Sequence, residues 1–123
     1  MLLIEIKCFF SDIPARLNEA YLIISRSGAS SLAEFCVFGR PSILIPLPFA
    51  VGNHQALNAM IMEEKGASIV LDQNSVNAHL LSRKICHILE NFRLANKMAA
   101  SARHIAQPDA ASNFAIELET LIR

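Results

Sequence analysis

Ser25 to Glu34 read Ser-Arg-Ser-Gly-Ala-Ser-Ser-Leu-Ala-Glu, a turn of small residues that leads into the start of a helix. The apolar run 21–24 precedes this turn and is typical of a buried parallel strand. The turn therefore follows the carboxyl end of a strand, where open α/β sheets bind their ligands. The first N–H groups of a helix have no partner inside it, so they favour a phosphate or a hydroxyl-rich ligand.

A second polar segment, Gly52-Asn-His-Gln-Ala-Leu-Asn58, follows the next apolar run along the chain. That run, 42–46, has the branched apolar composition of a second buried strand, and the loop 47–51 connects it to the polar segment. Because the carboxyl ends of neighbouring parallel strands meet at one edge of a sheet, both polar segments are expected to face the same crevice.

The elements that must position these segments alternate between strand and helix. The strands are predicted at 4–10, 21–25, 42–46 and 68–71. The helices are predicted at 14–20, 31–38, 54–65, 76–92, 94–103 and 109–122. The fifth helix is a helical stretch that follows the long fourth one, and the last begins near Asp109 and carries one apolar stripe. Strands separated by helices predict an α/β fold with a parallel sheet and right-handed crossovers.

Composition predicts one compact domain over residues 1–123. The chain is 53% hydrophobic with a formal net charge of zero, and a chain of this size buries roughly two-thirds of its surface. Nucleic acid is not expected as a partner, because binding a phosphate backbone needs clustered Lys or Arg. Prolines and charges interrupt every apolar run, so no transmembrane segment is expected, and the first residues do not have the pattern of a signal peptide.

The cysteines and histidines predict no metal site, and no cofactor is expected. Cys8, Cys36 and Cys86 are odd in number and far apart, which is typical of reduced core residues in a cytosolic protein. The four histidines do not have the spacing of known zinc motifs.

Three stretches of the sequence carry a resemblance to a known family: "ISRSGASSLAEFCVFGRPSILIPLP", "NHQALNA" and "EEKGASIVL". In this order they resemble the C-terminal domain of the MurG-type glycosyltransferases, glycosyltransferase family 28, which make the lipid-linked disaccharide of bacterial peptidoglycan. The resemblance runs from near Ile4 to the C-terminus and corresponds to roughly the last third of such an enzyme. It implies an incomplete Rossmann-like sheet of the GT-B type, with about four strands and flanking helices.

The resemblance also implies a ligand and a cellular place. The chain would be the part that binds the donor UDP-N-acetylglucosamine, in an enzyme that transfers N-acetylglucosamine to lipid-linked muramyl-pentapeptide. It would be cytoplasmic, and peripheral at the inner membrane through a partner. The alternative is a truncated, non-catalytic module that binds a nucleotide sugar or another protein. Because no catalytic residue is recognised here, the chain alone is expected to be inactive.

Ser31 and Glu34 allow two interpretations. Their spacing fits a capping box, in which each side chain bonds the main-chain N–H of the other residue. In the family, the glutamate at this position binds the ribose hydroxyls, and a carboxylate can accept hydrogen bonds from two neighbouring hydroxyls. The resemblance therefore favours ribose recognition by Glu34.

The turn before Glu34 is expected to hold the nucleotide. Ala29, Ser30 and Ser31 would present main-chain and hydroxyl donors, as their counterparts do in the family. Gly28 would serve backbone geometry, through a positive φ or a close approach. Arg26 has two open roles, pairing with the diphosphate or tying neighbouring loops together.

The second polar segment is expected to complete the site. His54 and Gln55 could be polar residues at a helix start without a ligand, but the family's pair contacts the donor's sugar hydroxyls and diphosphate. The Gln55 amide offers both an acceptor and two donors, as hydroxyl recognition requires. Asn53 and Asn58 are expected to fix the loop and the helix instead.

Phe9 and Phe10 precede the first predicted helix. They could be core aromatics, but in the family this segment packs on uracil and reads its edge through main-chain groups, which makes Phe10 a candidate uracil contact.

The four glycines include no G-x-G or G-G pair, so the family's glycine-rich loops have no counterpart here and the donor site is expected to be incomplete. In the family's strand order, 3-2-1-4-5-6, the first predicted strand and the second are separated by two strands. Either the strand 4–10 shifts to pair with 21–25, or another polypeptide, such as a separate N-terminal fragment, fills the gap.

Overall fold

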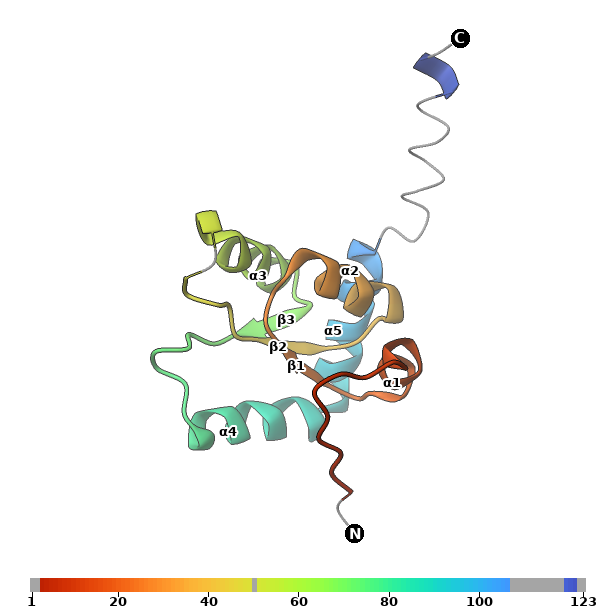
Figure 1. Cartoon of the computed structure of the whole chain (residues 1–123). Helices are drawn as coiled ribbons and strands as arrows, with labels where there is room; N and C mark the ends of the chain where they lie inside the picture. Colours follow the sequence, from red (N-terminus) through yellow and green to blue (C-terminus); the bar gives the residue numbers. More distant parts are fainter. Residues whose placement is uncertain (1–2, 50, 107–118, 122–123) are drawn as a thin grey trace.

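The computed structural model describes residues 3–49, 51–106 and 119–121 of the chain. A parallel sheet with the strand order β1-β2-β3 lies at its centre, and helices pack around it (Figure 1). The strands are β1 (Ile23–Ser25), β2 (Ser42–Leu44) and β3 (Ser68–Val70). The helices are α1 (Ile13–Glu19), α2 (Ala29–Phe38), the short 3₁₀ helix η1 (Val51–Asn53), α3 (His54–Glu64), α4 (Ala78–Leu89) and α5 (Phe92–Ile105). The predicted α/β class with a parallel sheet is confirmed.

The register of the sheet places the loops that carry the two polar segments beside each other. Ile24 of β1 lies opposite Ile43 of β2, which lies opposite Ile69 of β3. Each strand leads directly into a loop at its carboxyl end, so the loops after β1, β2 and β3 share one edge of the sheet.

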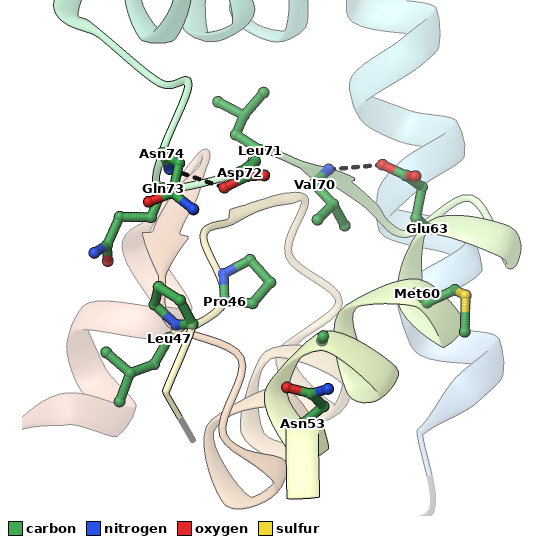
Figure 2. Close-up of a pocket in the computed structure, with 12 residues that line it drawn as sticks. Pro46, Leu47, Asn53, Met60, Glu63, Val70, Leu71, Asp72, Gln73 and Asn74 are labelled. Atoms are coloured by element: carbon green, nitrogen blue, oxygen red, sulfur yellow. Dashed lines mark hydrogen bonds between the residues drawn. The ribbon is translucent and has the colours of Figure 1, made fainter. Parts of the chain in front are cut away.

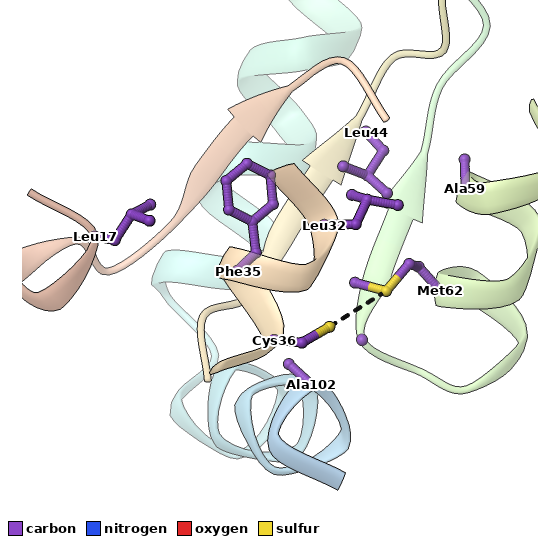
Figure 3. Packing of buried hydrophobic residues seen from close by; sticks show 9 residues of the cluster. Leu17, Leu32, Phe35, Cys36, Leu44, Ala59, Met62 and Ala102 are labelled. Atoms are coloured by element: carbon purple, nitrogen blue, oxygen red, sulfur yellow. Dashed lines mark hydrogen bonds between the residues drawn. The ribbon is translucent and has the colours of Figure 1, made fainter. Parts of the chain in front are cut away.

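Alternation along β2 divides the core between the two faces of the sheet. Leu44 packs with residues of α1, α2, α3 and α5, and Figure 3 shows it above Leu32 and Phe35 of α2. Ile43 points to the opposite face and packs with residues of α4 and the first half of α5. Both side chains are fully buried. The sheet is therefore covered by helices on both faces, as a parallel sheet requires.

The predicted strand 4–10 is wrong. Among the described residues, segment 3–12 forms neither a helix nor a strand, and β1 pairs only with β2. Most of its large apolar side chains are exposed, with Ile6 at 90% and Phe9 at 80%. A β-strand is stable only when a neighbour accepts its main-chain hydrogen bonds, and this segment pairs neither with the free edge of β1 nor with any other described strand. The shift of 4–10 onto 21–25 therefore does not occur, and the sheet has three described strands rather than about four.

Salt bridges hold segment 3–12 against α1 instead. Arg16 Nη1 lies 2.8 Å from Glu5 Oε2, and Arg16 Nε lies 2.8 Å from Asp12 Oδ1. Hydrogen bonds from Arg16, and for Glu5 also from Lys7, lower the pKa values of both carboxyls below their ordinary range. The segment is therefore attached through charge pairs rather than through a β-ladder.

The predicted elements between residues 14 and 103 are confirmed with shifted ends. α3 ends before Gly66, whose φ of +80° suits glycine. The predicted helices 76–92 and 94–103 are α4 and α5, and they are separated because Asn91 caps the second one by accepting a hydrogen bond from Leu94 N at 3.1 Å. Most of the predicted helix 109–122 lies outside the described residues. Its described part, residues 119–121, is helical.

The cysteine prediction holds for one of the three residues. Cys36 is buried, with its Sγ 3.6 Å from Met62 Sδ (Figure 3), and burial raises the pKa of its thiol. Cys8 and Cys86 are exposed, so their assignment to the core is wrong. Within the described ranges, no helix is long and apolar enough to span a bilayer.

Candidate functional site

The candidate site lies at the carboxyl edge of the sheet, where the loops that follow all three strands meet. The loop after β1 contains Arg26, Ser27 and Gly28, the loop after β2 leads to α3, and the loop after β3 contains Asp72. Short strands and immediate turns put the first two of these loops within hydrogen-bonding distance of each other. Both polar segments therefore lie at one edge, as expected.

Ser27 joins the first polar segment to the second. This residue is fully buried, and its hydroxyl donates to the main-chain oxygen of Gln55 at 2.7 Å. Its main-chain N–H donates to Gln55 Oε1 at 3.4 Å, and its main-chain oxygen accepts from Asn58 Nδ2 at 3.2 Å. These bonds lock the turn before α2 to the first turn of α3. The predicted role of Asn58 in fixing loop and helix is confirmed.

Sequence reasoning missed Ser27 as the centre of this network. A serine in a small-residue turn between Arg26 and Gly28 gives no signal of burial. Its role depends on how closely α3 approaches the turn after β1. The sequence predicted that the two polar segments share one edge of the sheet, but it did not predict this contact.

The Gln55 side chain serves both loops. Besides the bond to Ser27, its Oε1 accepts a hydrogen bond from Leu47 N at 2.9 Å. Its amide nitrogen makes no hydrogen bond with the described residues, so the two donors of that nitrogen remain available to a ligand. The predicted contact of Gln55 with a sugar or diphosphate stays a prediction.

Arg26 ties neighbouring loops together, one of the two roles considered for it. Its Nη1 donates to the main-chain oxygens of Ile45 at 3.1 Å and Pro46 at 3.5 Å. The guanidinium group thereby supports the start of the loop after β2. It carries five N–H donors in all, so pairing with a diphosphate stays a prediction beside this structural role.

The amino-terminal end of α2 is open. Gly28 is its N-cap, and the first helical hydrogen bond runs from Leu32 N to Gly28 O at 3.0 Å. The N–H groups of Ala29, Ser30 and Ser31 therefore have no acceptor inside the helix. Gly28 has φ −64°, so of the two roles expected for it the positive φ is wrong. Apart from its two chain neighbours, no described residue has an atom within 4 Å of the place that a Cβ would take at this position.

The interpretation of Ser31 and Glu34 as a capping box is wrong. α2 begins at Ala29, two residues earlier than predicted, because Gly28 takes the extended N-cap conformation. Ser31 is thus inside the helix and makes no side-chain cap bond. Glu34 is exposed and forms no ion pair or hydrogen bond with the described residues. One turn of helix separates it from Ser31, so both residues lie on the same face.

Two further predicted residues lie in different settings. His54 is exposed at the first position of α3. Its Nε2 would lie 3.0 Å from the Cβ of an alanine at position 52, so the imidazole lies close to Gly52. Phe10 is partly buried on segment 3–12, and its ring centroid lies 4.2 Å from the Arg16 guanidinium carbon. The structure brings Arg26, the start of α2 and Gln55 to one edge, whereas Phe10 is held by α1.

A pocket lies next to these residues at the ends of β2 and β3. Its volume is about 490 Å³, and Figure 2 shows Pro46 between Asn53 at the start of α3 and Asp72 after β3. Asn53 has a left-handed φ of 54° and makes no side-chain cap bond. Sequence reasoning missed the residues after β3, because Asp72, Gln73 and Asn74 carry no recognisable motif. Among the described residues, no group of three potential metal ligands is present.

Comparison with known proteins identifies the family. Residues 2–114 match the model of the glycosyltransferase family 28 C-terminal domain. The UDP-N-acetylglucosamine–N-acetylmuramyl-(pentapeptide) pyrophosphoryl-undecaprenol N-acetylglucosamine transferase of Paramagnetospirillum magneticum is 40% identical over 107 residues, which cover 87% of this chain and 29% of that enzyme. The enzyme with the same name from Gloeobacter violaceus is 41% identical, over 97% of this chain and 33% of its own length. The chain thus spans about a third of these curated relatives.

Solved structures agree with the sequence match. The crystal structure of Acinetobacter baumannii MurG superimposes with a TM-score of 0.85 at 31% identity, over 96% of this chain and 35% of that one. The glycotransferase of kitacinnamycin, at 19% identity and a TM-score of 0.64 over 76% of this chain and 23% of that one, shares the fold. The sheet, its flanking helices and the sequence therefore lead to one assignment: this chain belongs to glycosyltransferase family 28 and matches that family's C-terminal domain, of the GT-B type.

Proposed function

We propose that this chain is the donor-binding part of a family 28 glycosyltransferase and that it binds UDP-N-acetylglucosamine. With the remainder of such an enzyme, it would transfer N-acetylglucosamine to lipid-linked muramyl-pentapeptide, the reaction named for its relatives. The observation that carries the proposal is the Ser27–Gln55 lock, because it joins the open end of α2 to the first turn of α3. Two groups of donors that sequence separates by more than twenty residues thereby form one surface.

Each part of the nucleotide sugar has a suitable counterpart on this surface. The three N–H groups at 29–31 and the positive end of the helix dipole favour the diphosphate. The Glu34 carboxylate has no partner among the described residues and can accept from both ribose hydroxyls. The donors on the Gln55 amide nitrogen remain for the sugar or a phosphate oxygen. Open space at Gly28 lets the ligand approach the main chain closely.

Titration of the purified chain with UDP tests this proposal. Because Glu34 would make charge-assisted hydrogen bonds, Glu34→Ala is expected to weaken UDP binding about tenfold or more. Glu90→Ala removes an exposed carboxylate at the end of α4 and serves as the matched control, with unchanged affinity expected. Absence of UDP binding at millimolar concentration, or equal affinity of the Glu34→Ala variant, would refute the assignment.

The chain alone is expected to bind the donor but not to transfer the sugar. Transfer needs a base for the attacking hydroxyl and a second wall that holds the acceptor beside the donor, and positioning accounts for roughly 7 to 11 kcal/mol of such a barrier. The 123 residues span about a third of the curated relatives. We therefore propose that an N-terminal segment of the same family completes the enzyme, and that any membrane association of the chain comes through it.

The outer edge of β1 is the proposed place for this partner. No described strand pairs with that side of β1, and the exposed apolar residues of segment 3–12 lie in the chain just before α1. Co-expression with an N-terminal family 28 segment is expected to raise the melting temperature, since a partner that binds only the folded state stabilises it. A melting temperature that is the same with and without this segment would contradict the partner proposal. If the chain binds UDP but shows no sugar transfer when the N-terminal segment is present, the alternative is favoured, a non-catalytic nucleotide-sugar module.

A further inference from the structure

Among the described strands, β1 and β3 form the two edges of the sheet. A strand at an edge presents main-chain N–H and C=O groups that no neighbour uses, and a strand of another molecule can pair with them. The two edges of this sheet differ in whether a side chain already occupies such a group. This difference bears on where a second molecule can attach.

The hydrogen bonds of the sheet determine which residues of β3 face outward. Leu71 N, directly after β3, donates to Leu44 O of β2 at 2.9 Å. Alternate residues along a strand bond the same neighbour, so Ile69 and Leu71 direct their main-chain groups towards β2. Ser68 and Val70 therefore direct theirs away from the sheet.

Glu63 of α3 occupies one of these outward groups. Its Oε2 accepts a hydrogen bond from Val70 N at 2.7 Å, and Figure 2 shows the side chain reaching from α3 to the end of β3. The edge of β1 has no such bond. Ile23 N donates to Pro41 O at 3.0 Å, so Ile24 faces outward, and no described side chain bonds its main chain. The outward donor at Val70 is therefore occupied, whereas the one at Ile24 is open.

A second copy of this chain fits the β3 edge in one simple geometry. Ser68 and Val70 are separated by one residue, so a twofold axis at Ile69 would place Ser68 of each copy opposite Val70 of the other in an antiparallel pair. The two residues of such a pair exchange both of their N–H···O bonds, so each pair needs the Val70 N–H. Because Glu63 occupies this donor in each copy, each pair loses one of its bonds.

The surface beside this edge is apolar. Met60 lines the same pocket as Glu63 and Val70, and its side chain is 49% exposed, as are those of Leu57 and Ile61 on the same helix. Exposed apolar groups next to an unpaired strand favour association. Glu63 opposes association in a second way, because the twofold arrangement would bring the carboxylates of two copies close to one axis, where they repel each other.

We propose that Glu63 closes the β3 edge against pairing with a second copy of this chain. Of the two edges that the described strands form, only that of β1 is then left open to a partner strand. This inference goes beyond the proposed function, because it concerns the other edge of the sheet and does not depend on UDP binding. Its basis is the hydrogen bond from Val70 N to Glu63 and the outward direction of that N–H in the sheet.

Sedimentation equilibrium of the whole chain over a range of concentrations, with amide NMR spectra at each, tests the proposal. Glu63→Ala frees the Val70 N–H and is expected to raise the self-association constant about tenfold or more. The amides of Ser68 and Val70 should shift as the concentration rises. Glu64→Ala is the matched control, because the neighbouring Glu64 is exposed and makes no hydrogen bond or ion pair with the described residues. This control should associate as the parent chain does.

Two further variants separate closure of the edge from simple support of the fold. Glu63→Gln keeps a side-chain oxygen that can accept from Val70 N, so it should associate less than Glu63→Ala. Met60→Lys, added to Glu63→Ala, places a cation beside the edge in both copies and should return the association constant to the level of the parent chain. If Glu63 only supported the packing of α3 on β3, Glu63→Ala would lower the melting temperature without this charge-sensitive association.

Hydrogen exchange of the parent chain at low concentration gives a test that needs no variant. The Val70 amide has an acceptor in Glu63 and should exchange more slowly than the outward amide of Ile24. The proposal would be overturned by equal exchange at these two amides, or by equal association of Glu63→Ala and the parent chain. Concentration-dependent shifts at Ile24 rather than at Ser68 and Val70 would overturn it as well.

Discussion

Gln55 is held in the structure before any ligand arrives. Its side-chain oxygen accepts from Ser27 N and Leu47 N, two main-chain groups on different loops. The family resemblance implied a ligand contact for this residue, and its polarity is compatible with that role. What the sequence could not reveal is that half of the amide group is used to join the loops, because that depends on how closely α3 approaches the turn after β1.

The first prediction concerns the two hydrogen bonds that Gln55 Oε1 accepts from Ser27 N and Leu47 N. Gln55→Ala leaves the buried Ser27 N–H without its acceptor, so the free energy of unfolding should fall by about 1 to 2 kcal/mol. Gln55→Glu keeps both acceptor positions and should lose less. Urea unfolding of the two variants provides the measurement. If the Gln55→Ala variant is as stable as the parent chain, these two hydrogen bonds contribute nothing to the free energy of unfolding.

At the scale of the element, the start of α2 shows where local sequence rules were misleading. Ser31 and Glu34 have the spacing of a capping box, yet Gly28 caps the helix and Ser31 lies inside it. Both starts satisfy local preferences, since serine and glycine are each accepted as N-caps. The short connection from β1, which ends at Ser25, lets the helix begin earlier. The strand-turn-helix unit was predictable, whereas its exact boundary was not.

The second prediction uses the two glycines that flank α2. Gly39 ends the helix with a left-handed φ of 62°, and a Cβ there would lie 2.5 Å from Arg103 Cγ. Gly39→Ala should therefore lower the free energy of unfolding by about 1 to 2 kcal/mol or more, measured by urea unfolding. Gly28→Ala is the matched control, because its φ is −64° with open space around it. Alanine is a poorer N-cap than glycine, so this variant should lose some stability, but less than Gly39→Ala. Equal losses in the two variants would show that the left-handed φ at Gly39 carries no special cost.

The third prediction concerns segment 3–12 and pH. The pKa values of Glu5 and Asp12 are lowered by Arg16 from ordinary values of 4.5 and 3.8. Since the folded values are the lower ones, the attachment is at full strength above the ordinary values and is lost as pH falls through the lowered ones. The ring signals of Phe10, which lies over Arg16, should therefore shift towards unfolded positions on acidification.

An NMR titration from pH about 7 to about 2 measures this effect. In the Arg16→Gln variant the same ring signals should already lie near their acid positions at neutral pH. Ring signals that stay constant through the titration would show that the charge pairs do not hold the segment.

At the scale of the whole molecule, the parallel sheet and its flanking helices followed from the alternation of apolar runs and helical segments, whereas the strand order came from the family resemblance. The segment 4–10 did not become a strand, because a strand's stability lies in its neighbour rather than in its own composition. Likewise, the pocket beyond β3 could not be predicted, since its walls come from α3 and two loops that carry no common motif. The candidate nucleotide residues were found through the family resemblance, and the way they are joined was found only from the structure.

The most direct test of the central claim is to locate UDP on the chain. We predict that intermolecular NOEs and saturable amide shifts on adding UDP will concentrate at residues 29–34 and at Gln55, with ribose protons close to the Glu34 side chain. The Glu34→Ala variant should lose these ribose contacts. UDP that binds elsewhere on the chain, or that produces no saturable shift at residues 29–34, would contradict the assignment of this chain as the donor-binding part of a family 28 glycosyltransferase.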